Sequence, residues 1–232
     1  MPGIGAPISP ATLKFFRELR RHNHKEWMDA NRDRYRSEVV ERFRALLTAL
    51  SPAVLELNPS FDTSGRSRIN FSRINRDIRF AHDKTPYRPQ MYLRFPDPGA
   101  EDNSSAQLYV GISAKTVTSG FRAYAIGPAK TSPFRLIVLP RVEANPKWLG
   151  GQKQRLGRRY ESYWYSTEKG EWTKHQGWPL APEEWKKLRG WVVRRKFAPS
   201  AATRPRFVAD ISRSFYEVHP LFEFVCSPSW NP

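Results

Sequence analysis

The stretch LYVGISAKTVTSGF, residues 108–121, indicates the fold most clearly, because apolar residues alternate along it with polar or small ones. From Leu108 to Ile112 every second residue is apolar, the spacing that places side chains on one face of a strand. The same alternation runs through MYLRF, residues 91–95. The two glycines of the first stretch are expected at bulges or close backbone approaches. The middle of the chain therefore predicts half-buried strands.

On both sides of these strands the apolar residues recur at steps of three and four, which is typical of amphipathic helices. Ser9-Pro10 predicts a helix start, with serine as the cap and proline in the first turn. Asn23 and Glu26 have capping-box spacing for a second start. Three further helix starts are predicted, at Ser132, Pro182 and about Pro205.

The strongest helical period runs from Trp27 to Leu57. Pro52 is expected to interrupt it, because a proline inside a helix removes a backbone donor and clashes with the preceding turn. The order of helices, strands and helices predicts an α+β fold with a largely antiparallel central sheet flanked by N-terminal and C-terminal helices. We expect a flexible N-terminus, residues 1–8, followed by a single α+β domain over residues 9–228.

The charge balance is strongly basic. The 232 residues include 39 Lys and Arg against 22 Asp and Glu, a formal net charge of +17. Such a field attracts polyanions and phosphorylated molecules. The single cysteine, Cys226, excludes an internal disulfide and a cysteine-based metal knuckle. No apolar run is long enough to span a bilayer and the start does not resemble a signal peptide, so we expect a cytoplasmic protein without membrane insertion.

One segment concentrates the charge: RINRDIRFAHDKTPYRP, residues 73–89. If residues 71–80 are extended, Ile74, Ile78 and Phe80 share one face and charged side chains occupy the other. Asp77 would then orient the guanidinium of Arg73 or Arg79, and a pre-aimed arginine binds phosphate or carboxylate with less loss of freedom. The candidate ligand-binding residues are Arg73, Arg76, Asp77, Arg79, Lys84 and Tyr87. The alternative is the solvated face of an edge strand, with weak exposed ion pairs.

The segment Arg76–Tyr87, RDIRFAHDKTPY, resembles the signature of the domain of unknown function 2461 family, which occurs in many bacteria and some fungi. FFREL at residues 15–19 and the segment 25–35 are similar to the family's opening. GWVV at 190–193 and PLFEF at 220–224 are similar to its later blocks. The resemblance covers most of the chain and implies an uncharacterised protein with no established activity.

The resemblance also makes three residues of one helical face, at spacing four, candidates for a pocket wall: Trp27, Asn31 and Tyr35. Ordinary packing of the two aromatic side chains and helix capping by the asparagine is the alternative.

Motifs for cofactor, metal or nucleophilic chemistry are not recognisable in the sequence. The five histidines lack metal-ligand spacing, and no phosphate-binding loop, dinucleotide fingerprint or nucleophile elbow occurs. We therefore predict neither a metal nor a cofactor. A small-molecule enzyme acting on a phosphorylated or acidic substrate in the same pocket is the alternative to binding. In it Asp77 would be a base and Lys84 or Tyr87 an acid. An aspartate flanked by arginines has a lowered pKa, which favours binding.

Basic residues are interleaved with aromatic ones in two further segments, 153–165 and 186–196. That pattern suits single-stranded nucleic acid, because phosphates meet the cations and bases stack on the rings. The candidate contacts are Arg158, Arg159, Arg194 and Arg195. The alternative is that arginine stems cover aromatic residues of the core. Nucleic acid or a smaller anionic ligand is thus the predicted partner.

Overall fold

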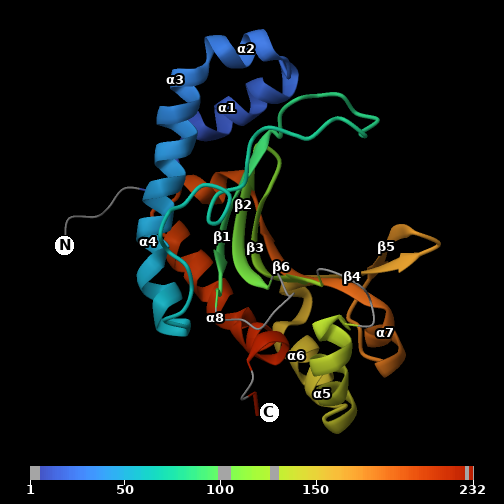
Figure 1. Ribbon diagram of the computed structural model, residues 1–232. Helices are drawn as coiled ribbons and strands as arrows, with labels where there is room; N and C mark the ends of the chain where they lie inside the picture. The colour runs from blue at the N-terminus through green and yellow to red at the C-terminus, as the bar shows by residue number, and fades with distance from the viewer. Residues whose placement is uncertain (1–5, 99–105, 126–130, 228–229, 232) are drawn as a thin grey trace. The chain divides into compact units, whose positions relative to one another are not determined.

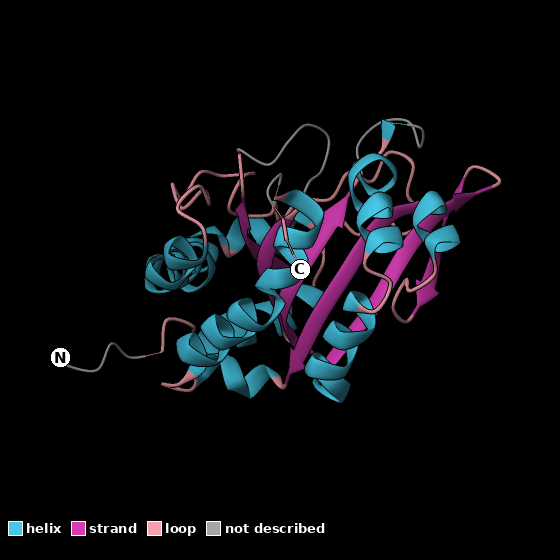
Figure 2. Ribbon diagram, turned by 90° about the horizontal axis from the view of Figure 1, so that it is seen from below, coloured by secondary structure: helices cyan, strands magenta, loops and turns pink. Residues whose placement is uncertain are grey.

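A computed structural model gives the fold for residues 6–98, 106–125, 131–227 and 230–231. Its strands are β1 (Gln90–Pro96), β2 (Gln107–Ser113), β3 (Val117–Tyr124), β4 (Tyr160–Glu168), β5 (Glu171–Gln176) and β6 (Leu188–Phe197). They form a six-stranded sheet in the order β1-β2-β3-β6-β4-β5, and Figure 2 shows them side by side. β4 is antiparallel to both β5 and β6.

Helices precede and follow the strands. They are α1 (Pro10–Arg21), α2 (Lys25–Ala30), α3 (Arg32–Tyr35), α4 (Glu41–Leu57), α5 (Leu139–Ala144), α6 (Trp148–Leu156), α7 (Pro182–Lys187) and α8 (Phe207–Cys226). Two π-helical turns, η1 (Arg36–Val40) and η3 (Phe134–Val138), and two short 3-10 turns, η4 (Gly157–Arg159) and η5 (Pro199–Thr203), adjoin them. The predicted α+β class with a largely antiparallel sheet and flanking helices is confirmed. None of the described helices is both long and apolar enough to cross a membrane.

The chain groups into two compact units. The first comprises Met1–Phe95, Val110–Thr118 and Phe197–Arg213, and the second comprises Pro96–Tyr109, Ser119–Lys196 and Ser214–Pro232. The single domain expected over residues 9–228 stays a prediction. Of the N-terminus expected to be flexible, residues 1–5 lie outside the described part of the chain, whereas Ile8 is buried.

The first unit begins as the sequence predicts. Ser9 caps α1 with a capping box, its Oγ accepting a hydrogen bond from the Thr12 backbone N–H at 3.2 Å. The predicted second cap is wrong by one position, because His24 rather than Asn23 caps α2. The side chain of Asn23 instead binds the backbone of Tyr87, a contact between residues 64 positions apart in sequence.

α3, η1 and α4 follow one another along one direction, with α1 and α2 beside their first end (Figure 1). The interruption predicted at Pro52 is wrong, because α4 continues through it to Leu57. The Ser51 hydroxyl donates to the Leu47 carbonyl at 2.8 Å, one turn earlier, beside the position where proline supplies no donor. The unit's core is apolar and includes Phe15, Phe16, Leu19, Phe43, Leu46, Leu50 and Leu93.

The second unit contains two elements that the apolar pattern does not predict, α6 and β6. β4 and β5 form a hairpin, paired from Tyr163 opposite Gln176 to Glu168 opposite Glu171. Gly120 lies against β6 so closely that a Cβ there would stand 2.1 Å from the Val193 carbonyl oxygen, which explains the glycine. Cys226 is buried near the end of α8. Large aromatic side chains dominate this core, among them Phe121, Phe134, Trp185, Trp191 and Phe224.

Candidate functional site

The charged segment, residues 73–89, forms a loop with a paired neck. Residues 74–76 lie antiparallel to residues 86–88, with a bridge between Asn75 and Tyr87. Backbone hydrogen bonds of 2.8 and 2.7 Å lie on either side of that bridge. The loop is therefore closed by its own backbone, and its ends are fixed relative to each other.

The extended strand predicted for residues 71–80 is wrong, because the described backbone there forms only isolated bridges. Exposed and less exposed side chains do alternate from Arg73 to Arg79. Phe80, which the strand would have turned toward the core, is 94% exposed. The alternation stops because the chain turns at residues 79–80 instead of continuing as a strand.

Asp77 and Arg79 form an ion pair on the surface of this loop. Nε and Nη2 of Arg79 donate to the two carboxylate oxygens of Asp77 at 3.0 and 2.8 Å. The hydrogen bonds from Arg79 lower the pKa of Asp77, so its carboxylate is a weak base at neutral pH. Both side chains are more than half exposed. Asp77 thus orients Arg79 in solvent.

Arg76 and Lys84 make their hydrogen bonds within the loop itself. Nη1 of Arg76 donates to Asp83 Oδ2 at 2.5 Å and to the Thr85 carbonyl at 3.2 Å. The Asp83 pKa is lowered to about 2, first by the hydrogen bond from the Thr85 backbone N–H and then by Arg76. Nζ of Lys84 donates to the Ile78 carbonyl at 3.1 Å. These cations stabilise the shape of the loop.

Tyr87 is buried. Asn23, which lies between α1 and α2, makes hydrogen bonds to both the N–H and the carbonyl of Tyr87. The Tyr87 N–H donates to Asn23 Oδ1 at 3.0 Å, and the Tyr87 carbonyl accepts from Asn23 Nδ2 at 2.8 Å. A hollow of about 430 Å³ beside this contact is lined by Arg20, Asn23, Arg76, Asp83, Thr85, Tyr87, Arg88, Pro89 and Gln90. The carboxylate of Asp83 makes that hollow less suited to an anion.

Arg73 lies elsewhere, in a hollow of about 450 Å³ that we call the arginine hollow. It is lined by Arg32, Tyr35, Val40, Arg44, Gly65, Ser67, Arg68, Phe71, Ser72, Arg73, Ile74, Asn75 and Met91. Four of these residues are arginines and none is acidic. The six predicted ligand-binding residues therefore divide: one lines the arginine hollow, two line the hollow beside Asn23, and three line neither.

Of the three predicted wall residues, Tyr35 lines the arginine hollow. Burial raises its pKa, so the phenol stays protonated and can donate a hydrogen bond. Trp27 packs against Phe15, with ring centroids 5.5 Å apart. Asn31 ends α2, where its Nδ2 donates to the Trp27 carbonyl at 2.8 Å. Trp27 and Asn31 thus act in packing and in helix termination, the alternative that the sequence left open.

The four arginines of the hollow differ in their partners. Arg32 is paired with Asp29 at 2.9 Å, and Arg44 with Glu41 at 3.0 Å. The guanidinium groups of Arg68 and Arg73 have no hydrogen-bond or ion-pair partner among the residues that the structure describes. These two groups are the ones available to a negatively charged ligand.

Arg68 is held in a tight turn with φ +72°, a conformation that residues other than glycine rarely adopt. Its N–H donates to the Phe71 carbonyl at 3.0 Å. Nη2 of Arg94 donates to the carbonyls of Arg68 and Phe71. A left-handed backbone at a residue with a long side chain is strained, and such strain clusters at functional sites. Here the surrounding hydrogen bonds fix the residue in spite of it.

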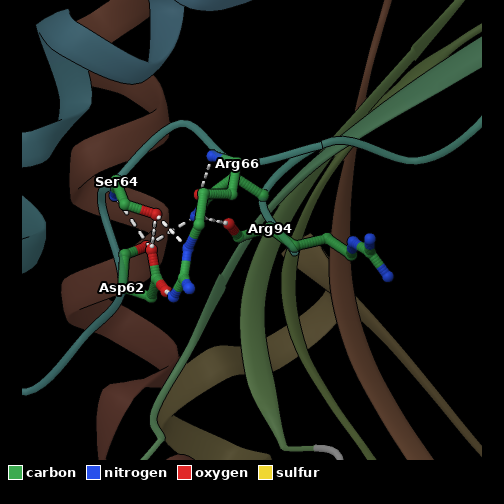
Figure 3. Close-up of polar contacts among 5 residues, drawn as sticks. Asp62, Ser64, Arg66 and Arg94 are labelled. Carbon is green, nitrogen blue, oxygen red and sulfur yellow. Dashed lines mark hydrogen bonds and ion pairs between the residues drawn. The ribbon is translucent and has the colours of Figure 1, made fainter. Parts of the chain in front are cut away.

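Asp62 and Asn70, both buried, stabilise the turn. Figure 3 shows Asp62 with Ser64 and Arg66. The Asp62 carboxylate accepts from Ser64 N at 2.9 Å, from Ser64 Oγ at 2.6 Å and from Arg66 Nη2 at 2.6 Å. Burial alone would raise the pKa of Asp62, but these hydrogen bonds outweigh it and lower the pKa. In Figure 3 the Arg94 guanidinium extends away from this carboxylate.

Asn70 connects the turn to the sheet. Its Nδ2 donates to the Asp62 carbonyl at 2.6 Å and to the Arg94 carbonyl at 3.1 Å, and its Oδ1 accepts from Arg66 N at 3.1 Å. Because Arg94 belongs to β1, the turn that carries Arg68 is attached to a strand. The backbone position of Arg68 is thus fixed by contacts within the chain.

Sequence reasoning missed Arg68 and the residues that support its turn. A local signal exists in Asp62-Thr63-Ser64-Gly65, a pattern in which the aspartate side chain binds the backbone two residues on. The contacts from Asn70 and Arg94, however, come from more distant positions and cannot be predicted from spacing.

The four predicted nucleic-acid contacts have different surroundings. Arg159 pairs with Glu217 at 2.7 Å, and Arg194 with Glu161 at 3.3 Å. Arg158 lines a hollow of about 480 Å³ together with Lys153, Tyr160 and Trp178. Arg195 lies on β6 opposite Tyr160. Nucleic-acid binding by these residues stays a prediction.

One pair has the geometry of a nucleophile and its base. Ser166 Oγ lies 2.7 Å from His175 Nε2, and Glu168 Oε1 lies 3.4 Å from the same nitrogen. Ser166 is completely buried, so a substrate cannot reach its hydroxyl. No group of three or more His, Cys, Asp or Glu residues suited to a metal occurs among the described residues.

Comparison with known families finds one match. The family model described as "Conserved hypothetical protein (DUF2461)" matches residues 11–224. A search of curated proteins finds no match to the chain. The match covers the arginine hollow and the turn that carries Arg68, together with the charged loop.

Proposed function

Because the chain belongs to the DUF2461 family, described as a conserved hypothetical protein, we propose its function from the geometry of the site alone. The protein binds a small ligand that carries a phosphate or carboxylate group. The group lies in the arginine hollow, where Arg68 and Arg73 contact it and the hydroxyl of Tyr35 donates a further hydrogen bond.

The observation that carries this proposal is the pair of guanidinium groups without partners among the described residues, in a hollow without an acidic lining residue. A guanidinium presents a rigid fork that matches phosphate and carboxylate oxygens. The backbone of Arg68 is also fixed by its turn, so little backbone freedom is lost when the ligand binds. The net charge of +17 favours the approach of an anion.

The rest of the hollow supports a ligand with an apolar or ring-shaped body. Its wall includes Val40, Phe71, Ile74 and Met91 beside the ring of Tyr35. A volume of about 450 Å³ lies in the range of small-molecule sites. A phosphorylated or carboxylated molecule with an aromatic portion therefore suits both parts of the wall.

The residues favour binding over chemistry. General acid–base catalysis needs a titratable group within hydrogen-bond reach of the reacting atoms. Asp77, proposed from the sequence as a base, does not line the hollow, and its pKa is lowered by Arg79. Tyr35 lines the hollow but stays protonated, so the lining residues supply hydrogen-bond donors and no base.

Calorimetric titration with phenyl phosphate, and with benzoate as the carboxylate probe, tests the proposal. The protein should bind at least one of the two probes. Arg68→Gln and Arg73→Gln should each weaken the binding of that probe by about tenfold or more, because a charge-assisted hydrogen bond is lost. Arg42→Gln is the matched control: Arg42 is exposed on α4 and does not line the hollow. Equal affinities of all three variants and the unmodified protein for both probes would contradict the proposal.

A further inference from the structure

A second set of cations and rings lies on one face of the sheet in the second unit. Along β4, Glu161, Tyr163, Tyr165 and Thr167 lie on one face and Ser162, Trp164 and Ser166 on the other; the second set is buried, and so is Tyr163 of the first. The register continues this face onto β5, where Lys174 is opposite Tyr165 and Trp172 is opposite Thr167. β5 ends the sheet order, so it is an edge strand, and Figure 1 shows it paired with β4. One face is thus packed, whereas the other is buried at Tyr163 and open to solvent toward β5.

Three rings form a cluster on this open face. The ring centroid of Trp172 lies 5.9 Å from that of Tyr165 and 6.2 Å from that of Tyr124, and the two tyrosine rings are 6.0 Å apart. Trp172 is 55% exposed, which is unusual for so large an apolar side chain. The cluster therefore presents aromatic surface to water.

Gly190 of β6 allows the ring of Tyr124 to lie against the sheet. A Cβ at Gly190 would stand 2.5 Å from Cδ1 of Tyr124, closer than atoms can approach. The ring thus occupies the space that a side chain at Gly190 would fill. This contact places Tyr124 beside Tyr165 and Trp172.

One cation lies beside the cluster, and two more lie beside Tyr163, whose ring centroid is 5.8 Å from that of Tyr165. The Arg122 guanidinium carbon lies 5.9 Å from the ring centroid of Tyr124. Lys174 Nζ and the Arg194 guanidinium carbon lie 4.2 and 5.0 Å from the ring centroid of Tyr163. Nε of Arg122 is buried and has no hydrogen-bond partner among the described residues. Glu161, the acidic residue beside them on this face, is shared between Arg194 and Lys196.

We propose that this face, which we call the ring face (Arg122, Tyr124, Tyr165, Trp172, Lys174 and Arg194), binds single-stranded nucleic acid. Bases stack on the exposed ring surface, and backbone phosphates contact the three cations. Proteins that bind single strands without sequence preference combine a basic track with aromatic rings in this manner. A duplex keeps its bases stacked on one another, so it offers the phosphates but not the base faces.

The ring face shares no residue with the arginine hollow, so the two proposals are independent. It differs in part from the sequence-based prediction of nucleic-acid contacts. Arg194 lies on the ring face, where it also pairs with Glu161, whereas Arg158 lines a different hollow and Arg159 pairs with Glu217 away from this face. The residues of the ring face come together because alternate side chains of a strand point to the same side of the sheet. Clusters of basic residues in the sequence do not identify them.

Fluorescence anisotropy with a short labelled oligothymidylate, and with a duplex of the same length, tests this inference. At fixed salt, Trp172→Ala and Tyr165→Ala should each weaken single-strand binding by about tenfold, because a stacked base loses its ring. Neither variant should alter duplex binding. Arg122→Gln and Lys174→Gln should each reduce the slope of log K against log salt by about 1.

Two controls keep the inference falsifiable. Tyr216→Ala removes an exposed ring on α8, and Lys187→Gln removes an exposed cation on α7; both should retain single-strand affinity. Far-ultraviolet circular dichroism and the thermal midpoint establish that each variant is folded. The inference is overturned if Trp172→Ala and Tyr165→Ala bind the oligothymidylate like the unmodified protein. It is equally overturned if Tyr216→Ala weakens binding as much as they do.

Discussion

Arg68 shows how a single residue can be held against its own conformational preference. Its left-handed backbone is fixed by a turn whose support comes from Asp62, Asn70 and Arg94. Glycine would adopt the same backbone without steric cost. An arginine at this position therefore sacrifices some stability, which a role for its side chain in ligand binding explains.

Replacing Arg68 by glycine separates the two effects. Arg68→Gly should raise the free energy of unfolding by about 0.5–1 kcal/mol, because the left-handed conformation is no longer strained. It should also weaken the binding of phenyl phosphate or benzoate, whichever the hollow takes. Urea unfolding and calorimetric titration of the same preparation measure both changes.

Lys169 supplies the matched control, since it also has a positive φ, +52°, in the turn between β4 and β5. Lys169→Gly should gain stability and keep the affinity for both probes. If Arg68→Gly lowers stability, or leaves both affinities unchanged, the explanation of the turn is wrong.

For single residues, the sequence predicts contacts between side chains a few positions apart, but it does not predict contacts between residues that are far apart in the sequence. Asp77 and Arg79 are two residues apart, and their ion pair follows from that spacing. The sign of φ at Arg68 depends on hydrogen bonds from Asn70 and Arg94, the latter 26 residues away. The spacing of residues in the sequence does not indicate such contacts.

Among the elements, the loop of residues 73–89 depends on its neck and on Asn23. Asn23→Ala removes a donor and an acceptor from the buried backbone of Tyr87. It should lower the free energy of unfolding by about 1–3 kcal/mol, since both backbone groups lose their partners. Chemical unfolding followed by circular dichroism measures the change.

The control for that variant lies in the same neck. The side chain of Asn75 is exposed, so Asn75→Ala should change stability by less than about 0.5 kcal/mol. Equal destabilisation by the two substitutions would mean that the hydrogen bonds of Asn23 do not secure the loop.

Periodicity predicted α1, α8 and the strands β1 to β3, because apolar residues recur regularly in their sequences. The half-buried character predicted for the strands holds for β1 alone of these three and is wrong for β2 and most of β3, which are buried on both faces. It missed α6, which contains two glycines and only two buried residues, Leu149 and Leu156. It also missed β6, whose buried run from Gly190 to Val193 does not alternate. The strand predicted at residues 71–80 had the right alternation but no partner strand along most of its length.

For the whole molecule, net charge is known from the sequence, but its distribution is not. Because the chain contains 39 Lys and Arg residues and 22 Asp and Glu residues, repulsion between its positive charges destabilises the folded state. Sodium chloride should therefore raise the thermal midpoint by screening this repulsion.

Sodium phosphate at equal ionic strength should raise the midpoint further, because under our proposal it also binds in the arginine hollow. The double variant Arg68→Gln, Arg73→Gln should keep the response to chloride and lose the additional response to phosphate. Differential scanning calorimetry in the two salts makes the comparison. Identical midpoints in chloride and phosphate for the unmodified protein would argue against phosphate binding in the hollow.

Cys226, buried near the end of α8, gives the chain a practical advantage. Shielded thiols react slowly with alkylating reagents, and the sequence contains no other cysteine. A single cysteine introduced at an exposed position would therefore accept a spin label or a fluorophore selectively. Two such variants, one labelled beside the arginine hollow and the other beside β5, would then report on each surface separately and in real time.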